Sequence, residues 1–161
     1  MCKNFLIIAI IIITSVMFIY SYQEIYAAKA SSTSTTSSSG SDMTDLLARL
    51  INGEARGESY LGQVAVGAVV LNRVKSSEFP NTISGVIYQK NQFSCVTDGQ
   101  FNKPIKKEST VYKAAKEAIN GSDPSNGALF FYNPKTAKSQ WLYSLKTVKV
   151  IGNHRFAVSS K

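Results

Sequence analysis

The 161-residue sequence predicts an α+β domain that is mainly helical and carries a small antiparallel sheet near its C-terminus. Two observations support this fold class. Apolar residues recur at three- and four-residue intervals in segments before residue 120, which is the spacing of one face of a helix. Short runs of strand-forming residues, bounded by turn residues, come only after residue 127. Helices that precede a separate sheet are typical of α+β proteins.

The N-terminal region predicts a signal peptide over residues 1–30. Residues 5–20 are almost wholly apolar, Lys3 precedes them, and small residues near Ala28 and Ala30 fit a signal-peptidase site. If it is not cleaved, this segment would be a membrane anchor, and we expect no other contact with a membrane. Residues 31–42 (SSTSTTSSSGSD) predict a flexible Ser/Thr-rich linker. The remaining residues, 43–161, are long enough for one globular domain.

The chain is basic, with a formal net charge of +8. An exported basic domain points to an anionic polymer outside the cytoplasmic membrane, such as cell-wall glycan or teichoic acid. Export argues against nucleic acid as the partner. We therefore expect the protein in the cell wall or on the outer face of the membrane.

The first helix is predicted over residues 42–52, with Asp42 as its N-cap and Asp45 in a weak capping box. Residues 61–74 (LGQVAVGAVVLNRV) are apolar on nearly every side, so they predict a buried central helix capped by Ser59. In this helix Gly62 and Gly67 would let another helix approach closely.

A short helix is predicted over residues 82–88, followed by an ordered, aperiodic loop over 89–108. Ser109 is expected to cap a helix that ends near Ile119, with Ile119 facing inward. A strand is predicted over 128–132. Residues 148–151 and 154–158 predict a β-hairpin, because Gly152-Asn153 fits a two-residue turn.

Glu54 is the candidate catalytic residue. The apolar stripe of the first helix continues onto Glu54 and then onto Glu58. A carboxyl group on a buried stripe is desolvated, which disfavours its charged form, as a general acid near neutral pH requires. Gly53 and Gly57 would leave open space beside it for a ligand. Alternatively, Glu54 is an exposed residue at the helix end or the partner of a nearby arginine.

The carboxylates allow two kinds of glycan chemistry. A glycosidase of the two-carboxylate type needs a second Asp or Glu, for which Glu58 and Asp98 are the candidates. A lytic transglycosylase needs one acid, which protonates the glycosidic oxygen and then accepts a proton from the sugar's 6-hydroxyl. Glu54 extends the apolar stripe, and no second catalytic carboxylate is evident for it in the sequence. The single-acid scheme is therefore the simpler interpretation.

A second hypothesis is a thiol peptidase or amidase that uses Cys95 and His154. The residues after Cys95 do not predict a helix start, where nucleophilic cysteines commonly lie, and His154 fits a surface or structural role. A third hypothesis is a wall-binding module without catalysis. One His, one Cys in the predicted domain and scattered carboxylates give no metal-ligand spacing, so we expect no metal and no cofactor.

Aromatic side chains could line a glycan cleft, since flat rings pack against sugar faces. The residues predicted to bind substrate are Glu58, Gln92, Phe93, Tyr132 and Trp141. Tyr143 is a further aromatic candidate. Arg56 and Arg73 could contact peptidoglycan carboxylates or pair with Glu58.

Three segments carry a resemblance to a known family: NGEARGESYLGQVAVGAVVLNRVKSSEFPNTISGVIYQKNQFSCVTDGQ, GALFFYNPKTAKSQW and IGNHRFAV. Together they resemble the cell wall hydrolase family of the spore cortex-lytic enzymes SleB and CwlJ, over about residues 45–158. The resemblance implies a lysozyme-like mixed fold and a catalytic domain that acts on peptidoglycan. It also implies lytic transglycosylase action between N-acetylmuramic acid and N-acetylglucosamine, often on spore cortex during germination. The family's catalytic glutamate, the first of GEARGE, corresponds to Glu54.

The resemblance leaves the biological role open. SleB-type proteins usually carry a peptidoglycan-binding module before the catalytic domain, and here a Ser/Thr-rich linker stands in that place. CwlJ-type proteins usually lack an export signal. Cortex lysis with recruitment by an accessory protein and general remodelling of the vegetative wall are therefore both expected alternatives.

Overall fold

The computed structural model describes residues 40–160, and residues 42–161 form one compact unit. The predicted signal peptide and residues 31–39 of the predicted linker lie outside the described residues. Residues 40–42, predicted as linker, are helical. Within the described part of the chain, no helix has the length and apolar character needed to cross a membrane.

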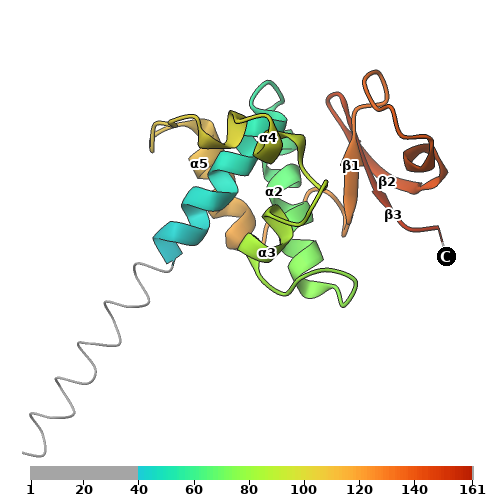
Figure 1. Ribbon diagram of the computed structural model, residues 1–161, viewed down its shortest axis with the longest axis horizontal. Helices are drawn as coiled ribbons and strands as arrows, with labels where there is room; N and C mark the ends of the chain where they lie inside the picture. Colours follow the sequence, from blue (N-terminus) through green and yellow to red (C-terminus); the bar gives the residue numbers. More distant parts are fainter. Residues whose placement is uncertain (1–39, 161) are drawn as a thin grey trace, which may run out of the picture. The chain divides into compact units, whose positions relative to one another are not determined.

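The order of the elements confirms the predicted α+β class. The N-terminal helix, described over residues 40–55, is followed by α2 (Tyr60–Lys75), α3 (Ile83–Ile87), α4 (Ser94–Thr97), the 3-10 helix η1 (Gln100–Asn102) and α5 (Thr110–Ile119). The strands come last: β1 (Phe130–Tyr132), β2 (Lys146–Ile151) and β3 (His154–Val158), with the 3-10 helix η2 (Gln140–Ser144) before β2. Figure 1 shows the sheet beside the group of helices.

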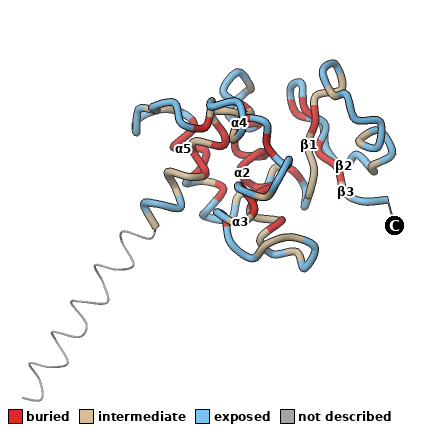
Figure 2. The backbone as a smooth tube through the Cα atoms, in the orientation of Figure 1, coloured by how far each residue is buried: buried red, intermediate tan, exposed pale blue. Residues whose placement is uncertain are grey.

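Helix α2 is the buried central helix that its sequence predicts. Ser59 caps it by accepting a hydrogen bond from the Gly62 N–H, and most residues from Gly62 to Val70 are inaccessible to solvent (Figure 2). A Cβ on Gly67 would lie 3.1 Å from Ala118 Cβ in α5 and 3.1 Å from Ile51 Cδ1 in the N-terminal helix. The prediction for Gly67 is therefore confirmed, whereas Gly62 lies against Glu58, Ser59 and Ile151 instead of a helix.

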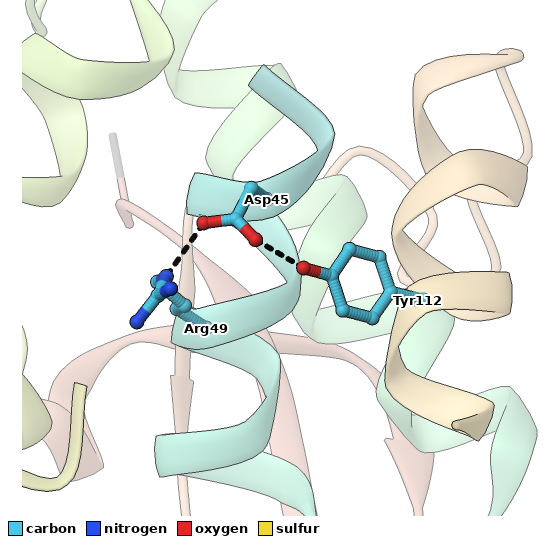
Figure 3. A network of polar contacts seen from close by, with 3 residues as sticks. All are labelled: Asp45, Arg49 and Tyr112. Atoms are coloured by element: carbon cyan, nitrogen blue, oxygen red, sulfur yellow. Dashed lines mark hydrogen bonds and ion pairs between the residues drawn. The ribbon is translucent and has the colours of Figure 1, made fainter. Parts of the chain in front are cut away.

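The N-terminal helix is longer than predicted at both ends. Asp42 and Asp45 lie inside it, because serine and glycine weaken a helix without stopping it as proline does. The helix passes through Gly53 to residue 55, so Glu54 lies in its last turn. Asp45 is not part of a cap; it accepts hydrogen bonds from Arg49, at 2.6 Å, and from the Tyr112 hydroxyl of α5 (Figure 3). The Tyr112 contact joins the N-terminal helix to α5, whereas the Arg49 contact lies within the N-terminal helix.

The loop over residues 89–108 is ordered, as predicted, but it contains α4 and η1. The expectation that no helix begins near Cys95 is wrong, because Cys95 is the second residue of α4. A helix of four residues shows no sequence periodicity and depends on its packing. The inward position predicted for Ile119 is also wrong: Ile119 is exposed, and Ala114 is buried in its place.

The sheet is antiparallel, with strand order β1-β3-β2. The predicted hairpin is confirmed: Ile151 pairs with His154 across the Gly152-Asn153 turn, where Gly152 has a φ of 56°. The central strand β3 buries Phe156 completely, and Phe156 pairs with Phe131 of β1. This buried side of the sheet carries the residues that face the candidate site.

Candidate active site

A cleft of about 450 Å³ lies between the end of the N-terminal helix and the sheet. Its lining residues come from the helix end, the loop to α2, α4, β1, the β1–η2 connection, η2 and β3. They are Glu54, Ala55, Gly57, Glu58, Ser94, Phe131, Tyr132, Asn133, Thr136, Ala137, Leu142 and His154. Two carboxylates and one imidazole therefore share the cleft with apolar and aromatic walls.

Glu54 is half-buried in the last turn of the N-terminal helix. Its Oε1 accepts a hydrogen bond from the Cys95 N–H at 3.1 Å, so α4 holds the carboxylate in place. Neither Arg49, which pairs with Asp45, nor Arg56, which donates to Gln100, pairs with Glu54. The salt bridge of Arg49 is with Asp45, at 2.6 Å. Glu54 is thus a cleft carboxylate without a cationic partner in the described part of the chain.

Cys95 lies directly against the helix that carries Glu54. A Cβ on Gly53 would lie 2.4 Å from Cys95 Cβ and 2.8 Å from Sγ, so only glycine permits this approach. The space beside Gly53 is therefore filled by Cys95, not open as predicted, whereas a Cβ on Gly57 would meet nothing within 4 Å. Burial, and then the negative charge of Glu54, raise the pKa of the Cys95 thiol. This buried thiol, absent from the cleft lining, is unsuited to act as a nucleophile.

Glu58, a candidate second carboxylate, is bound to the turn between β2 and β3. Its Oε2 accepts a hydrogen bond from the Asn153 N–H at 3.1 Å, and its Oε1 accepts one from Asn153 Nδ2 at 3.0 Å. These hydrogen bonds lower the pKa of the Glu58 carboxyl, although burial opposes them. The other candidate, Asp98, accepts a hydrogen bond from the Gln100 N–H and does not line the cleft.

His154 is buried, with 8% of its surface exposed, and it lines the cleft. Its ring lies against Phe131, at 5.3 Å between centroids, and against Phe156, at 6.2 Å. Burial lowers the pKa of His154, while the negative charges of Glu58 and Glu54 act in the opposite direction. The buried Nδ1 has no hydrogen-bond partner within residues 40–160. Of the surface and structural roles predicted for His154, the surface position is wrong, because the ring is buried against Phe131 and Phe156 and forms a wall of the cleft.

Three of the predicted substrate-binding residues, Gln92, Phe93 and Trp141, lie outside the cleft lining. Phe93 is buried in the core, and its ring stacks on Phe131 at 6.3 Å, so it supports a cleft wall from behind. Gln92 accepts a hydrogen bond from Arg73 Nη1 at 3.1 Å. Sequence spacing could not place these residues, because a loop has no periodicity that separates inward from outward positions.

Arg73 has a structural role instead of the predicted contact with Glu58 or substrate. It is buried, donates to the Leu129 carbonyl at 2.7 Å, and lies over the rings of Phe79, Phe93 and Phe130. Burial lowers its pKa to about 10. Arg73 therefore fixes the start of β1 against α2.

The other aromatic candidates lie on β1 and η2. Tyr132 lines the cleft and contacts Tyr143 edge-on, with 5.5 Å between ring centroids. Trp141 is half-exposed and contacts Phe130 at 5.4 Å, outside the cleft lining. Sequence reasoning missed Phe131 as a cleft residue, because three consecutive aromatic residues in a strand do not show which one faces the site.

No group of three or more His, Cys, Asp or Glu side chains within residues 40–160 is arranged to hold a metal ion. The cleft lining includes the carboxyl groups of Glu54 and Glu58 and the imidazole of His154.

The chain is similar to known proteins in sequence and in fold. The model of the Cell Wall Hydrolase family matches residues 57–157, a range that begins just after Glu54. The chain is 50% identical over 111 residues to the spore cortex-lytic enzyme of Bacillus cereus, which covers 69% of this chain and 42% of that protein. It is 34% identical over 119 residues to the cell wall hydrolase CwlJ of Bacillus subtilis, covering 70% of this chain and 82% of CwlJ. The chain thus spans less than half the length of the spore cortex-lytic enzyme.

The fold is also similar to a solved structure, the catalytic domain of the germination-specific lytic transglycosylase SleB from Bacillus anthracis. The two have a TM-score of 0.67 and 48% sequence identity, covering 71% of this chain and 93% of that domain. At this identity the likeness extends beyond the fold to much of the sequence.

Proposed function

The chain belongs to the cell wall hydrolase family, and we propose that it is a lytic transglycosylase that cleaves peptidoglycan between N-acetylmuramic acid and N-acetylglucosamine. One observation carries the mechanism. Two carboxylates line the cleft. Both oxygens of Glu58 accept hydrogen bonds from Asn153 in the β2–β3 turn, whereas Glu54 accepts one from the Cys95 N–H and none from the sheet. One carboxyl group that is not bound to the turn fits transglycosylation, because the 6-hydroxyl of the sugar itself supplies the nucleophile.

In the proposed reaction, protonated Glu54 donates its proton to the glycosidic oxygen while the bond from that oxygen to C1 of muramic acid breaks. The Cys95 N–H stabilises the carboxylate that forms. Glu54 then accepts the proton of the 6-hydroxyl, whose oxygen bonds to C1 and closes a 1,6-anhydro ring. The glutamate returns to its starting state, and no water is consumed.

The cleft supports a sugar ligand. Its volume lies in the range of small-molecule sites, and the side chains of Phe131 and Leu142 supply apolar surface beside the polar Ser94 and Asn133. Peptidoglycan glycan strands are therefore the proposed substrate.

We assign spore cortex as the substrate form because the relatives are spore cortex-lytic enzymes and a germination-specific transglycosylase. With this substrate, the protein would act outside the cytoplasmic membrane, in the cell wall or spore cortex. The signal peptide over residues 1–30, the linker over residues 31–39 and recruitment by an accessory protein remain predictions.

The test is a digest of purified peptidoglycan by the wild-type chain and by the Glu54→Gln variant, which keeps the shape of the side chain but cannot donate the proton. Vegetative peptidoglycan and cortex peptidoglycan containing muramic lactam are digested in parallel, and the products are identified by mass spectrometry. We expect anhydro-muropeptides from the wild type, preferentially from cortex. The variant should lose activity by about 10³-fold or more, as removal of a proton-transferring group does.

Other products would contradict particular parts of the proposal. Reducing ends in place of anhydro sugars would mean hydrolysis by water. Equal release from both substrates would favour general wall remodelling. Cleaved stem peptides with intact glycan strands, together with an active Glu54→Gln variant, would reject the glycan-cleaving function.

A further inference from the structure

The Gly152-Asn153 turn is bound to the helical part of the domain at the edge of the cleft. Asn153 donates two hydrogen bonds to Glu58, one from its backbone and one from its side chain. A Cβ on Gly152 would lie 2.2 Å from Glu58 Oε2, so the carboxylate can reach the turn only because residue 152 is glycine. The turn and the carboxylate are thus fitted to each other, although 95 residues separate Glu58 from Asn153.

Glu58 is itself held close to Glu54. The Glu58 N–H donates to the Ala55 carbonyl at 3.0 Å, at the end of the helix that carries Glu54. The Glu58 carbonyl accepts a hydrogen bond at 3.3 Å from Gln63, a buried residue of α2. Glu58 is therefore tied to both helices before its carboxylate reaches the sheet.

The residue after the turn is His154, whose ring forms one wall of the cleft. His154 packs on Phe131, another wall residue, so displacement of the turn would move the ring and disturb this contact. We call the two hydrogen bonds between Glu58 and Asn153 the clamp. The clamp thus connects the end of the helix that bears Glu54 to the strand that bears His154.

We propose that Glu58 is a positioning residue whose carboxylate, bound to Asn153, holds the His154 wall of the cleft at a fixed place relative to Glu54. Its effect on catalysis rests on the function proposed above; its effect on His154 does not. The hypothesis that Glu58 is a second catalytic carboxylate makes a different prediction, because a clamp tolerates an amide where a nucleophile or base does not.

The experiment compares four variants of the full chain: Glu58→Ala, Glu58→Gln, Asn153→Asp, and the double variant Glu58→Gln/Asn153→Asp. Glutamine can keep both hydrogen bonds if the Asn153 amide rotates and accepts from the new NH₂ group. Asn153→Asp sets two carboxylates against each other, and the double variant restores a donor and an acceptor. Glu78→Ala is the control, since it removes the same charge from an exposed position outside the cleft.

The first readout is the rate at which diethyl pyrocarbonate modifies His154, which is the only histidine of the chain. Local opening of the turn should raise this rate by about tenfold or more in Glu58→Ala and Asn153→Asp. Glu58→Gln, the double variant and Glu78→Ala should match the wild type. Circular dichroism identifies any variant that does not fold. If Glu58→Ala does not fold, the proposal is still tested by whether adding Glu58→Gln to Asn153→Asp restores the wild-type modification rate.

The second readout is kcat and KM on peptidoglycan. Glu58→Ala and Asn153→Asp should lower kcat/KM by about 10- to 100-fold, through both constants, because a misplaced wall affects binding and orientation together. Glu58→Gln and the double variant should stay within about threefold of the wild type.

Two outcomes would overturn the proposal. One is a Glu58→Gln variant as inactive as Glu54→Gln with His154 still protected, which would make Glu58 catalytic. The other is unchanged His154 modification in both Glu58→Ala and Asn153→Asp. If the wild type cleaves no glycan, the proposed function fails, and the modification rates still decide whether the clamp exists.

Discussion

Cys95 and Glu54 constrain each other at the residue scale. The packing of Cys95 on Gly53 brings the Cys95 N–H to the Glu54 carboxylate, so one contact both buries the thiol and orients the proposed acid. The negative charge of Glu54 in turn disfavours the thiolate. The same closeness that makes Cys95 useful as a hydrogen-bond donor through its backbone makes its side chain unreactive.

We predict that Cys95 resists alkylation while the protein is folded. In a Cys2→Ser background, where Cys95 is the only thiol, iodoacetamide at neutral pH should react about 100-fold more slowly with the folded chain than with the unfolded chain, because burial and the raised pKa both suppress the thiolate. Mass spectrometry measures the rate. Rapid labelling of the folded chain, accompanied by loss of activity, would instead support the thiol hydrolase.

At the scale of elements, the N-terminal helix has to be held so that its last turn meets the cleft. Tyr112 of α5 and Arg49 of the same helix both donate to Asp45, and the Tyr112 contact connects this helix to α5 about two turns before Glu54 (Figure 3). The Arg49 hydrogen bond, followed by that of Tyr112, lowers the pKa of Asp45. The network is partly exposed, so its contribution to stability is limited by solvent.

Replacing Tyr112 by phenylalanine should lower the free energy of unfolding by about 1 kcal/mol at neutral pH, since one hydrogen bond to a carboxylate is lost without a large cavity. The loss should shrink as the pH falls through the lowered pKa of Asp45, because protonation of Asp45 weakens the same contact in the wild type. Urea denaturation measures both effects. Tyr60→Phe is the control, since its hydroxyl donates to Glu117 at an exposed site and should cost less. Equal losses for the two variants would contradict a special role for the Asp45 network.

For the whole molecule, the helices and the sheet meet at a cleft that is lined by the carboxylates of Glu54 and Glu58 and by the buried His154. Folding must keep His154 neutral, because burial lowers its pKa below the usual 6.5. The unfolded chain therefore takes up this proton at a higher pH than the folded protein does. It follows that the contribution of His154 to stability is complete above about pH 6.5 and is lost as the pH falls toward the folded pKa.

We predict that this single proton makes the stability of the domain depend on pH below about pH 6.5, by at most about 1.4 kcal/mol per pH unit. The free energy of unfolding in urea, measured across this range, should fall more steeply for the wild type than for His154→Gln. Parallel curves for the two proteins would show that His154 does not titrate differently on folding.

Features that depend on local chemistry could be predicted from the sequence. A long apolar segment and the Ser59 cap identified α2, and the Gly152-Asn153 pair identified the β2–β3 hairpin, because backbone preferences and turn geometry act over a few residues. The position of Glu54 on an apolar stripe made it a candidate by the same argument.

Which residues from distant segments lie together at the site is known only from the tertiary structure. Several features of the site join residues that are far apart in the chain. They are the contact of Cys95 with Gly53, the hydrogen bonds between Glu58 and Asn153, the burial of Phe93 and the position of His154 in the cleft. Their positions depend on packing between elements, and neither periodicity nor spacing contains that information. For this reason the two glutamates of one seven-residue block, which look alike in the sequence, have different surroundings in the fold: Glu54 opens to the cleft, and Glu58 is bound to the sheet.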